Sequence, residues 1–224
     1  MSRLFTFGCS FTNYRWSTWA DCLAPEFDEF QNWGQSGGGN HYIFNSVMEA
    51  DQRHHFDSND TVVVCWTTVL RDDRYVDKRW HTLGNMFNCP IYDPVYLKTH
   101  VDERGCVIRD FAYIKAVKTL LESKSDLNWR FLGVDNLKSK DKDVIAVYTD
   151  VLESLLPSYQ EVLFPSGWKI AEDPHPSPAE HLAYLDAVLP GWVTKAETRA
   201  IMQEESVNLR KNPAMTGLSK VTRL

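Results

Sequence analysis

Two residues in this sequence have types and neighbours suited to chemistry: a serine near the start of the chain and a histidine near its end. Ser10 stands in FGCSFT, directly after the apolar run at 3–8. His175 stands in DPHPSPAEH, between two prolines and close to Glu172 and Asp173. A nucleophilic serine needs a base to accept its proton, and a carboxylate best orients that base. The pattern therefore indicates nucleophilic catalysis. The structural alternatives are a serine that caps the next helix and an ordinary rigid loop around the histidine.

A glycine-rich segment, NWGQSGGGN at 32–40, is the third feature with chemical potential. Three consecutive glycines permit close backbone approach and leave N–H groups free to face an anion or a developing oxyanion. A phosphate-binding loop does not fit, because no Gly-Lys-Ser/Thr follows. The segment is therefore either part of an oxyanion site or a flexible turn.

Strands and helices must alternate along the chain to position these groups. The continuous apolar run TVVVCW at 61–66 suits a strand buried on both faces. We therefore predict an α/β fold, a three-layer α/β/α sandwich around a central parallel sheet, with ligands bound beyond the carboxyl ends of the strands. Apolar runs predict strands at 3–8, 28–33, 61–66, 129–134 and 161–164. Apolar residues three or four apart predict helices at 14–24, 40–55, 109–123, 142–155, 178–188 and 193–207.

The domain organisation follows from length and composition. The chain has 224 residues, of which 43% are hydrophobic and 24% charged, and these values are ordinary for a globular protein. We predict one α/β domain over 1–207 and a basic C-terminal extension over 208–224. Residues 68–105 interrupt the alternation and predict a long irregular insertion, which is either a lid or binding loop or a packed surface excursion.

Several classes of protein and of site are disfavoured by composition. The longest apolar runs fall far short of the roughly 20 residues that cross a bilayer, and no secretory signal pattern opens the chain, so we expect a cytoplasmic protein with no membrane partner. A net charge of −6 gives no general attraction to nucleic acid. Five cysteines without a CxxC pair favour reduced thiols. We expect no metal and no cofactor, since the adjacent His54 and His55 point in different directions on a helix.

The order of these features resembles that of the SGNH hydrolases, also called the GDSL family. FGCSFT looks like the family's Gly-Asp-Ser motif, with Cys9 in place of the aspartate, and NWGQSGGGN is similar to its Asn-x-Gly-x-Ser-Gly. DPHPS looks like its Asp-x-x-His. The resemblance implies a flavodoxin-like fold with Ser10 as nucleophile and His175 as base. Either Glu172, at the family's spacing, or Asp173, one residue closer and favoured here, would orient the imidazole.

The resemblance also implies an oxyanion hole made by the backbone N–H groups of Ser10 and Gly37. The family's third block supplies an asparagine side chain as a further donor, but here that stretch reads CWTTVLR and Thr67 falls at the asparagine position. Losing one such donor typically slows an enzyme by about 100- to 1,000-fold. Either the Thr67 hydroxyl or the side chain of Asn40 is the candidate replacement.

The activity implied by the resemblance is hydrolysis of a small ester, with an O-acyl group on a carbohydrate as the first candidate. Asn40, Trp66 and Arg71 are the expected substrate-binding residues, and the expected partner is a small-molecule or glycan ester. Compact members without a signal peptide look like those encoded by phages and marine bacteria. The competing interpretation is a catalytically inert protein of this fold that binds glycans or takes part in virion assembly. It is motivated by Thr67, the displaced acid and the basic C-terminal residues.

Overall fold

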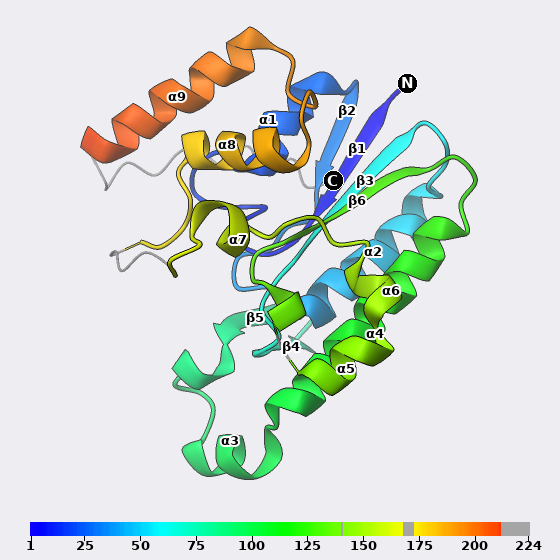
Figure 1. The fold of residues 1–224 in the computed structure, drawn as a ribbon, viewed down its shortest axis with the longest axis vertical. Coiled ribbons are helices and arrows are strands. Elements are labelled where there is room, and N and C mark those ends of the chain that lie inside the picture. The colour runs from blue at the N-terminus through cyan, green and yellow to red at the C-terminus, as the bar shows by residue number, and fades with distance from the viewer. Residues whose placement is uncertain (140, 168–172, 212–224) are drawn as a thin grey trace.

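A four-stranded parallel sheet organises the computed structural model, which describes residues 1–139, 141–167 and 173–211. The strand order is β2-β1-β3-β6. The predicted α/β/α sandwich with a central parallel sheet is confirmed (Figure 1). Glu172 and most of the predicted extension 208–224 lie outside the described residues. The strands are β1 (Arg3–Phe7), β2 (Glu29–Asn32), β3 (Asp60–Trp66) and β6 (Asn128–Gly133).

Helices cover both faces of the sheet (Figure 1). None of the helices in the described part of the chain combines the length and the apolar composition that a bilayer crossing requires. One face carries α2 (Asn40–His54), α4 (Glu103–Glu122), α5 (Lys142–Val147) and α6 (Thr149–Leu152). The other carries α1 (Trp19–Leu23), α7 (Tyr159–Leu163), α8 (Pro178–Val188) and α9 (Ala196–Lys211). The 3-10 turns are η1 (Ala24–Glu26), η2 (Met86–Asn88) and η3 (Leu137–Ser139).

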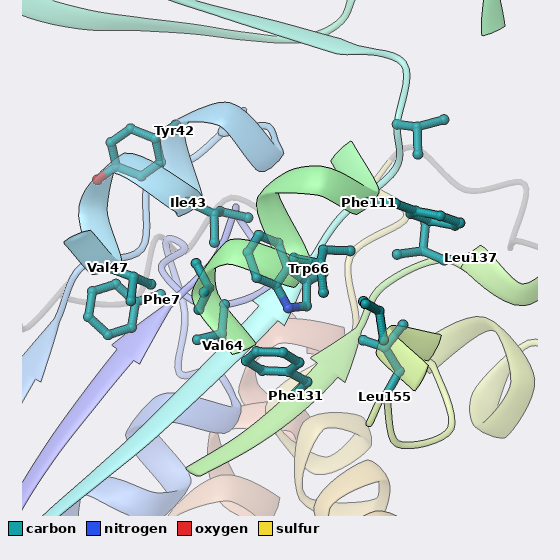
Figure 2. Close-up of a cluster of buried hydrophobic side chains, with 14 of the residues drawn as sticks. Phe7, Tyr42, Ile43, Val47, Val64, Trp66, Phe111, Phe131, Leu137 and Leu155 are labelled. Carbon is teal, nitrogen blue, oxygen red and sulfur yellow. The ribbon is translucent and has the colours of Figure 1, made fainter. Parts of the chain in front are cut away.

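Strand β3 shows why the sheet is buried on both sides. All seven of its residues are buried, and successive side chains in a strand point to opposite faces. Val64 and Trp66 pack toward α2 and α4, where Trp66 meets Phe131 at a ring separation of 5.6 Å (Figure 2). Val63 and Cys65 pack toward α1 and α8 instead. The continuous apolar sequence therefore serves two separate hydrophobic cores.

The register places the carboxyl ends of three strands at one edge. Phe7 at the end of β1 pairs with Val64 of β3, and Thr6 pairs with Asn32 at the end of β2. The residues that follow β1, β2 and β3 therefore meet at this edge, as expected for a parallel sheet. These residues include Ser10 and the glycine-rich turn.

The strand predicted at 161–164 is wrong, because residues 161–163 belong to helix α7 (Tyr159–Leu163) and Phe164 is its C-cap. Ser158 and Glu161 form a capping box at its start, with the Ser158 N–H donating to Glu161 Oε2 at 2.8 Å. A capped first turn outweighs the strand preference of Val162 and Phe164. The helix predicted at 142–155 is divided between α5 and α6, and residues 14–18 of the helix predicted at 14–24 form a loop.

Much of the range 68–105 is regular, which corrects the predicted irregular insertion. Strands β4 (Arg71–Val76) and β5 (Arg79–Asn85) form an antiparallel hairpin, followed by η2 and α3 (Pro94–His100). Asp77 and Lys78 make the two-residue turn with φ values of 51° and 63°, as hairpin turns of this length require. The hairpin packs on the glycine-rich turn, where the Gly84 N–H donates to Gly37 O at 3.1 Å.

Candidate active site

Ser10 lies in a tight turn immediately after β1. The Thr12 N–H donates to Cys9 O at 2.9 Å, and the Cys9 side chain is fully buried in the core beneath. Gly8 permits the turn, since a Cβ there would lie 2.0 Å from Thr12 Oγ1. Ser10 itself is 7% exposed. The close chain approach thus holds the Ser10 hydroxyl at the carboxyl edge of the sheet.

The structure brings Ser10, His175 and Asp173 into one hydrogen-bonded chain. Ser10 Oγ lies 2.8 Å from His175 Nε2, and His175 Nδ1 lies 2.7 Å from Asp173 Oδ1. The His175 backbone N–H also donates to Asp173 Oδ1, at 3.0 Å. An ionised carboxylate can only accept, so Nδ1 carries the proton and Nε2 is free to accept the serine proton. This is the geometry that a serine nucleophile and its base require.

The surroundings of Asp173 and His175 favour an ionised carboxylate and a neutral imidazole. Burial opposes ionisation of Asp173, but hydrogen bonds from Tyr14 and His175 outweigh it, so the pKa of the carboxyl is below its ordinary value. Burial lowers the pKa of His175, although Asp173 raises it through a hydrogen bond and its charge. The imidazole is therefore neutral, and able to accept a proton, near neutral pH.

Tyr14 and Arg15 complete the surroundings of the acid, and sequence reasoning missed both. The Tyr14 hydroxyl donates to Asp173 Oδ2 at 2.7 Å, and Arg15 Nη2 reaches the same oxygen at 2.5 Å. The Tyr14 ring stacks on the His175 imidazole at 4.0 Å with an interplanar angle of 17°. Burial, with Asp173, raises the pKa of Tyr14 to about 12, so its hydroxyl stays a donor. No local motif signals this role, which depends on a loop far away in the sequence.

The glycine-rich turn is held firmly against the end of β1. The Gln35 N–H donates to Gly8 O at 3.0 Å, and Thr82 Oγ1 of the hairpin donates to Ser36 O at 2.8 Å. Gly37 has a φ of 77°, and a Cβ there would lie 2.2 Å from Thr82 O, so glycine is required. In the part of the chain that the structure describes, the N–H groups of Gly37 and Ser10 donate no hydrogen bond. Neither N–H is committed to an acceptor within the described chain, as a donor to a developing oxyanion requires.

Asn40 and Trp66, the predicted substrate-binding residues, are both fully buried, so neither has exposed surface for a substrate. Both Asn40 amide hydrogens are engaged, on Thr67 O at 3.0 Å and on Asp110 Oδ2 at 2.8 Å, and the side chain is fully buried. Its Oδ1 accepts from the Thr67 N–H at 2.9 Å, so Asn40 fastens the end of β3 to α2 and α4. Trp66 is 0% exposed and belongs to the core, because it lies with Val64 on the face of β3 that α2 and α4 cover.

Thr67 and Arg71 have different surroundings. Thr67 is fully buried and its hydroxyl has no hydrogen-bond partner among the described residues. Its assignment as an oxyanion donor stays a prediction. Arg71 is half-buried at the start of β4, and its Nη1 donates to Gly38 O at 2.8 Å. This contact places the guanidinium beside the glycine-rich turn.

His181, expected to pack or cap within its helix, is buried in α8. Its Nδ1 lies 2.7 Å from the Tyr159 hydroxyl, and burial lowers its pKa to about 3. It is a second buried histidine near His175, but it is hydrogen-bonded within the core on the α8 face of the sheet.

No protein-family model matches this chain, and no curated protein matches it either. Among solved structures, the chain is similar to a member of the lipolytic protein G-D-S-L family from Veillonella parvula, at 11% identity and a TM-score of 0.42, over 95% of this chain and 100% of that one. It is also similar to an acetyl xylan esterase from the rumen bacterium Butyrivibrio proteoclasticus, at 12% identity and a TM-score of 0.46, over 85% of this chain and 65% of that one.

A third similar structure is an alpha/beta hydrolase enzyme from the metagenome of Lake Arreo, at 15% identity and a TM-score of 0.46, over 87% of this chain and 97% of that one. At such identities and TM-scores these are likenesses only. The function of this chain has to follow from the geometry of its site.

Proposed function

We propose that this chain is a serine hydrolase that cleaves small esters. The observation that carries the proposal is the hydrogen-bonded chain from Ser10 Oγ through His175 to Asp173, beside two backbone N–H groups that donate to no described residue. Acyl transfer by a serine needs these parts together: a nucleophile, a base, an orienting acid and donors for the developing oxyanion.

The chemistry follows from the atoms in place. Ser10 Oγ attacks the ester carbonyl carbon while His175 Nε2 accepts the hydroxyl proton, and the N–H groups of Ser10 and Gly37 stabilise the oxyanion. The tetrahedral intermediate collapses as His175 returns the proton to the leaving alcohol, which leaves an acyl group on Ser10. Water then attacks the acyl carbon with His175 as base. The carboxylic acid departs and Ser10 regains its proton.

Tyr14 and Arg15 act as positioning residues in this proposal. They occupy Asp173 Oδ2 while His175 occupies Oδ1, so the carboxylate cannot rotate without losing a charge-assisted hydrogen bond. The stacked Tyr14 ring further restrains the plane of the imidazole. The base is thereby held in the orientation that meets Ser10.

The substrate proposed is a small ester, and an O-acyl group on a carbohydrate remains the first candidate. Because Trp66 lies in the core, the aromatic side chains proposed to contact a sugar are those of the hairpin β4–β5. Tyr75 of β4 and Trp80 of β5 lie with ring centroids 5.6 Å apart, and Tyr75 is largely exposed. Such amphipathic rings are suited to a polar ligand with apolar faces.

A fluorophosphonate probe tests the activated serine directly, because the probe reacts with a nucleophilic serine without needing the natural substrate. We expect one adduct by intact mass on the wild type and none on Ser10→Ala or His175→Ala. Ser123→Ala, an exposed serine at the end of α4, is the matched control and should label as the wild type does. A folded wild type that forms no adduct would refute the hydrolase and favour the inert glycan-binding or assembly protein.

A further inference from the structure

Arg71 stands out because no carboxylate in the described part of the chain forms an ion pair with it. No carboxylate oxygen of the described residues lies within 4.0 Å of its guanidinium. Its only hydrogen bond there is from Nη1 to the carbonyl of Gly38, and its Nε is buried without a partner. A half-buried guanidinium in this condition is costly unless another group neutralises it.

The surrounding chain is shaped to hold Arg71 in this place. A Cβ on Gly39 would lie 2.7 Å from Arg71 Cβ, so only a glycine at this position lets the Arg71 side chain pack against the glycine-rich turn. The Arg71 carbonyl accepts from Arg109 Nη2 at 3.0 Å, which fixes the backbone. The nearby Asp73 makes no ion pair with it, and the Asp73 oxygens accept instead from the N–H groups of Gly39 and Tyr42 at the start of α2. Burial raises the pKa of Asp73, and the charge of Arg71 opposes that rise from beyond ion-pair distance.

The position of Arg71 relates it to the proposed reaction. Gly38, which holds its Nη1, directly follows Gly37, whose N–H is a proposed oxyanion donor. The positive charge of Arg71 also contributes to lowering the pKa of His175, after burial. A local cation of this kind contrasts with the net charge of −6 of the whole chain.

We propose that Arg71 binds an anionic group of the substrate, so that the preferred ester carries a carboxylate close to the scissile carbonyl. This inference rests on the proposed function. Arginine suits the role because its fork of N–H donors matches a carboxylate in two places at once. The remaining Nη hydrogens supply those donors while Nη1 keeps its contact with Gly38. The substrate class is thus narrowed from small esters to acidic esters.

The test compares two matched pairs of esters. On the acyl side these are 4-nitrophenyl hemisuccinate and 4-nitrophenyl butyrate; on the alcohol side they are 4-acetoxybenzoate and its methyl ester. We expect the wild type to favour the acidic member of one pair by about 10-fold or more in kcat/KM. Arg71→Gln should bring that ratio close to one, and Arg71→Lys should retain part of it. Arg79→Gln, an exposed arginine of the same hairpin, should leave the ratio unchanged.

Three outcomes would overturn the inference: no preference in the wild type for either pair, a preference that survives Arg71→Gln, or an equal loss on acidic and neutral esters. The last would mean that Arg71 acts on the oxyanion itself. Calorimetric binding of succinate and 4-hydroxybenzoate to Ser10→Ala, with and without Arg71→Gln, gives a readout independent of turnover. Binding that needs Arg71, in a protein whose Ser10 does not react with fluorophosphonate, would retain the anion site and reject the hydrolase.

Discussion

The contact between Tyr14 and Asp173 leads to a sharp prediction about the base. Replacing Tyr14 by phenylalanine keeps the ring that stacks on His175 and removes only the hydroxyl, which lies 2.7 Å from Asp173 Oδ2. A hydrogen bond to a charged group is worth about 1.5–3 kcal/mol, or roughly 10- to 150-fold if all of it served positioning. Arg15 still holds Oδ2. Because Arg15 keeps this oxygen in place, we expect a loss in kcat at or below the lower limit of that range, about 3- to 10-fold, with little change in KM.

The pH dependence of Tyr14→Phe has a definite sign. Activity requires neutral His175, so kcat/KM rises with pH through the pKa of this imidazole. Without the Tyr14 hydroxyl, the Asp173 carboxylate has fewer donors and interacts more strongly with the imidazolium, which raises the pKa of His175. The acidic limb of the profile should move to higher pH.

The assay is a kcat/KM profile between pH 5 and pH 9 with a neutral aryl ester, on the wild type, Tyr14→Phe and the control Tyr96→Phe. Tyr96 is exposed on α3, and its hydroxyl makes no hydrogen bond to Asp173. A limb that stays in place or moves to lower pH, with kcat unchanged, would refute the assigned positioning role. A thermal melt at each pH separates such effects from unfolding.

Two further perturbations follow from buried groups. Thr67→Val removes a buried hydroxyl that has no partner among the described residues, so the free energy of unfolding in urea should stay the same or rise. If Thr67 is an oxyanion donor, kcat should fall about 10-fold or more. An unchanged kcat would remove Thr67 from the oxyanion hole. His181, with a pKa of about 3 in the fold and an ordinary value of 6.5 unfolded, binds its proton more weakly when folded. Its contribution to stability is therefore complete above pH 6.5 and is lost as pH falls toward 3. Between pH 7 and pH 4.5 the free energy of unfolding should fall by about 2–3 kcal/mol more in the wild type than in His181→Asn. Equal pH slopes in the two proteins would contradict the buried, neutral assignment.

The sheet could be predicted from the sequence because its strands are continuous apolar runs. β1, β3 and β6 lie within one residue of the predicted bounds. The prediction for 161–164 was wrong because Val162 and Phe164 favour a strand locally, whereas Ser158, which opens the capping box of α7, lies before the predicted range. A helix cap is signalled by one or two individual residues, so it is easily missed when a segment is read from its run of apolar residues.

The candidate site was predictable only in part. Ser10, Gly37 and His175 have distinctive types and neighbours, so their stretches could be singled out. Tyr14 lacks such a signal, since its partner Asp173 is 159 residues away. Trp66 was expected to bind substrate, but it is a core residue. The burial of β3 on both faces, which its continuous apolar sequence predicts, already implied this position.

The long sequence separation across the site also concerns how the protein is made. Ser10 and His175, which share a hydrogen bond, are 165 residues apart, and three of the four strands of the parallel sheet, β2, β3 and β6, lie between them. Loop closure of this length is among the slow steps of folding, so contacts of this kind form late. During synthesis, no nascent chain shorter than 175 residues can assemble the serine with its base. Labelling of Ser10 would therefore report on completed folding of the domain, and it would be absent from truncated chains that end before α8.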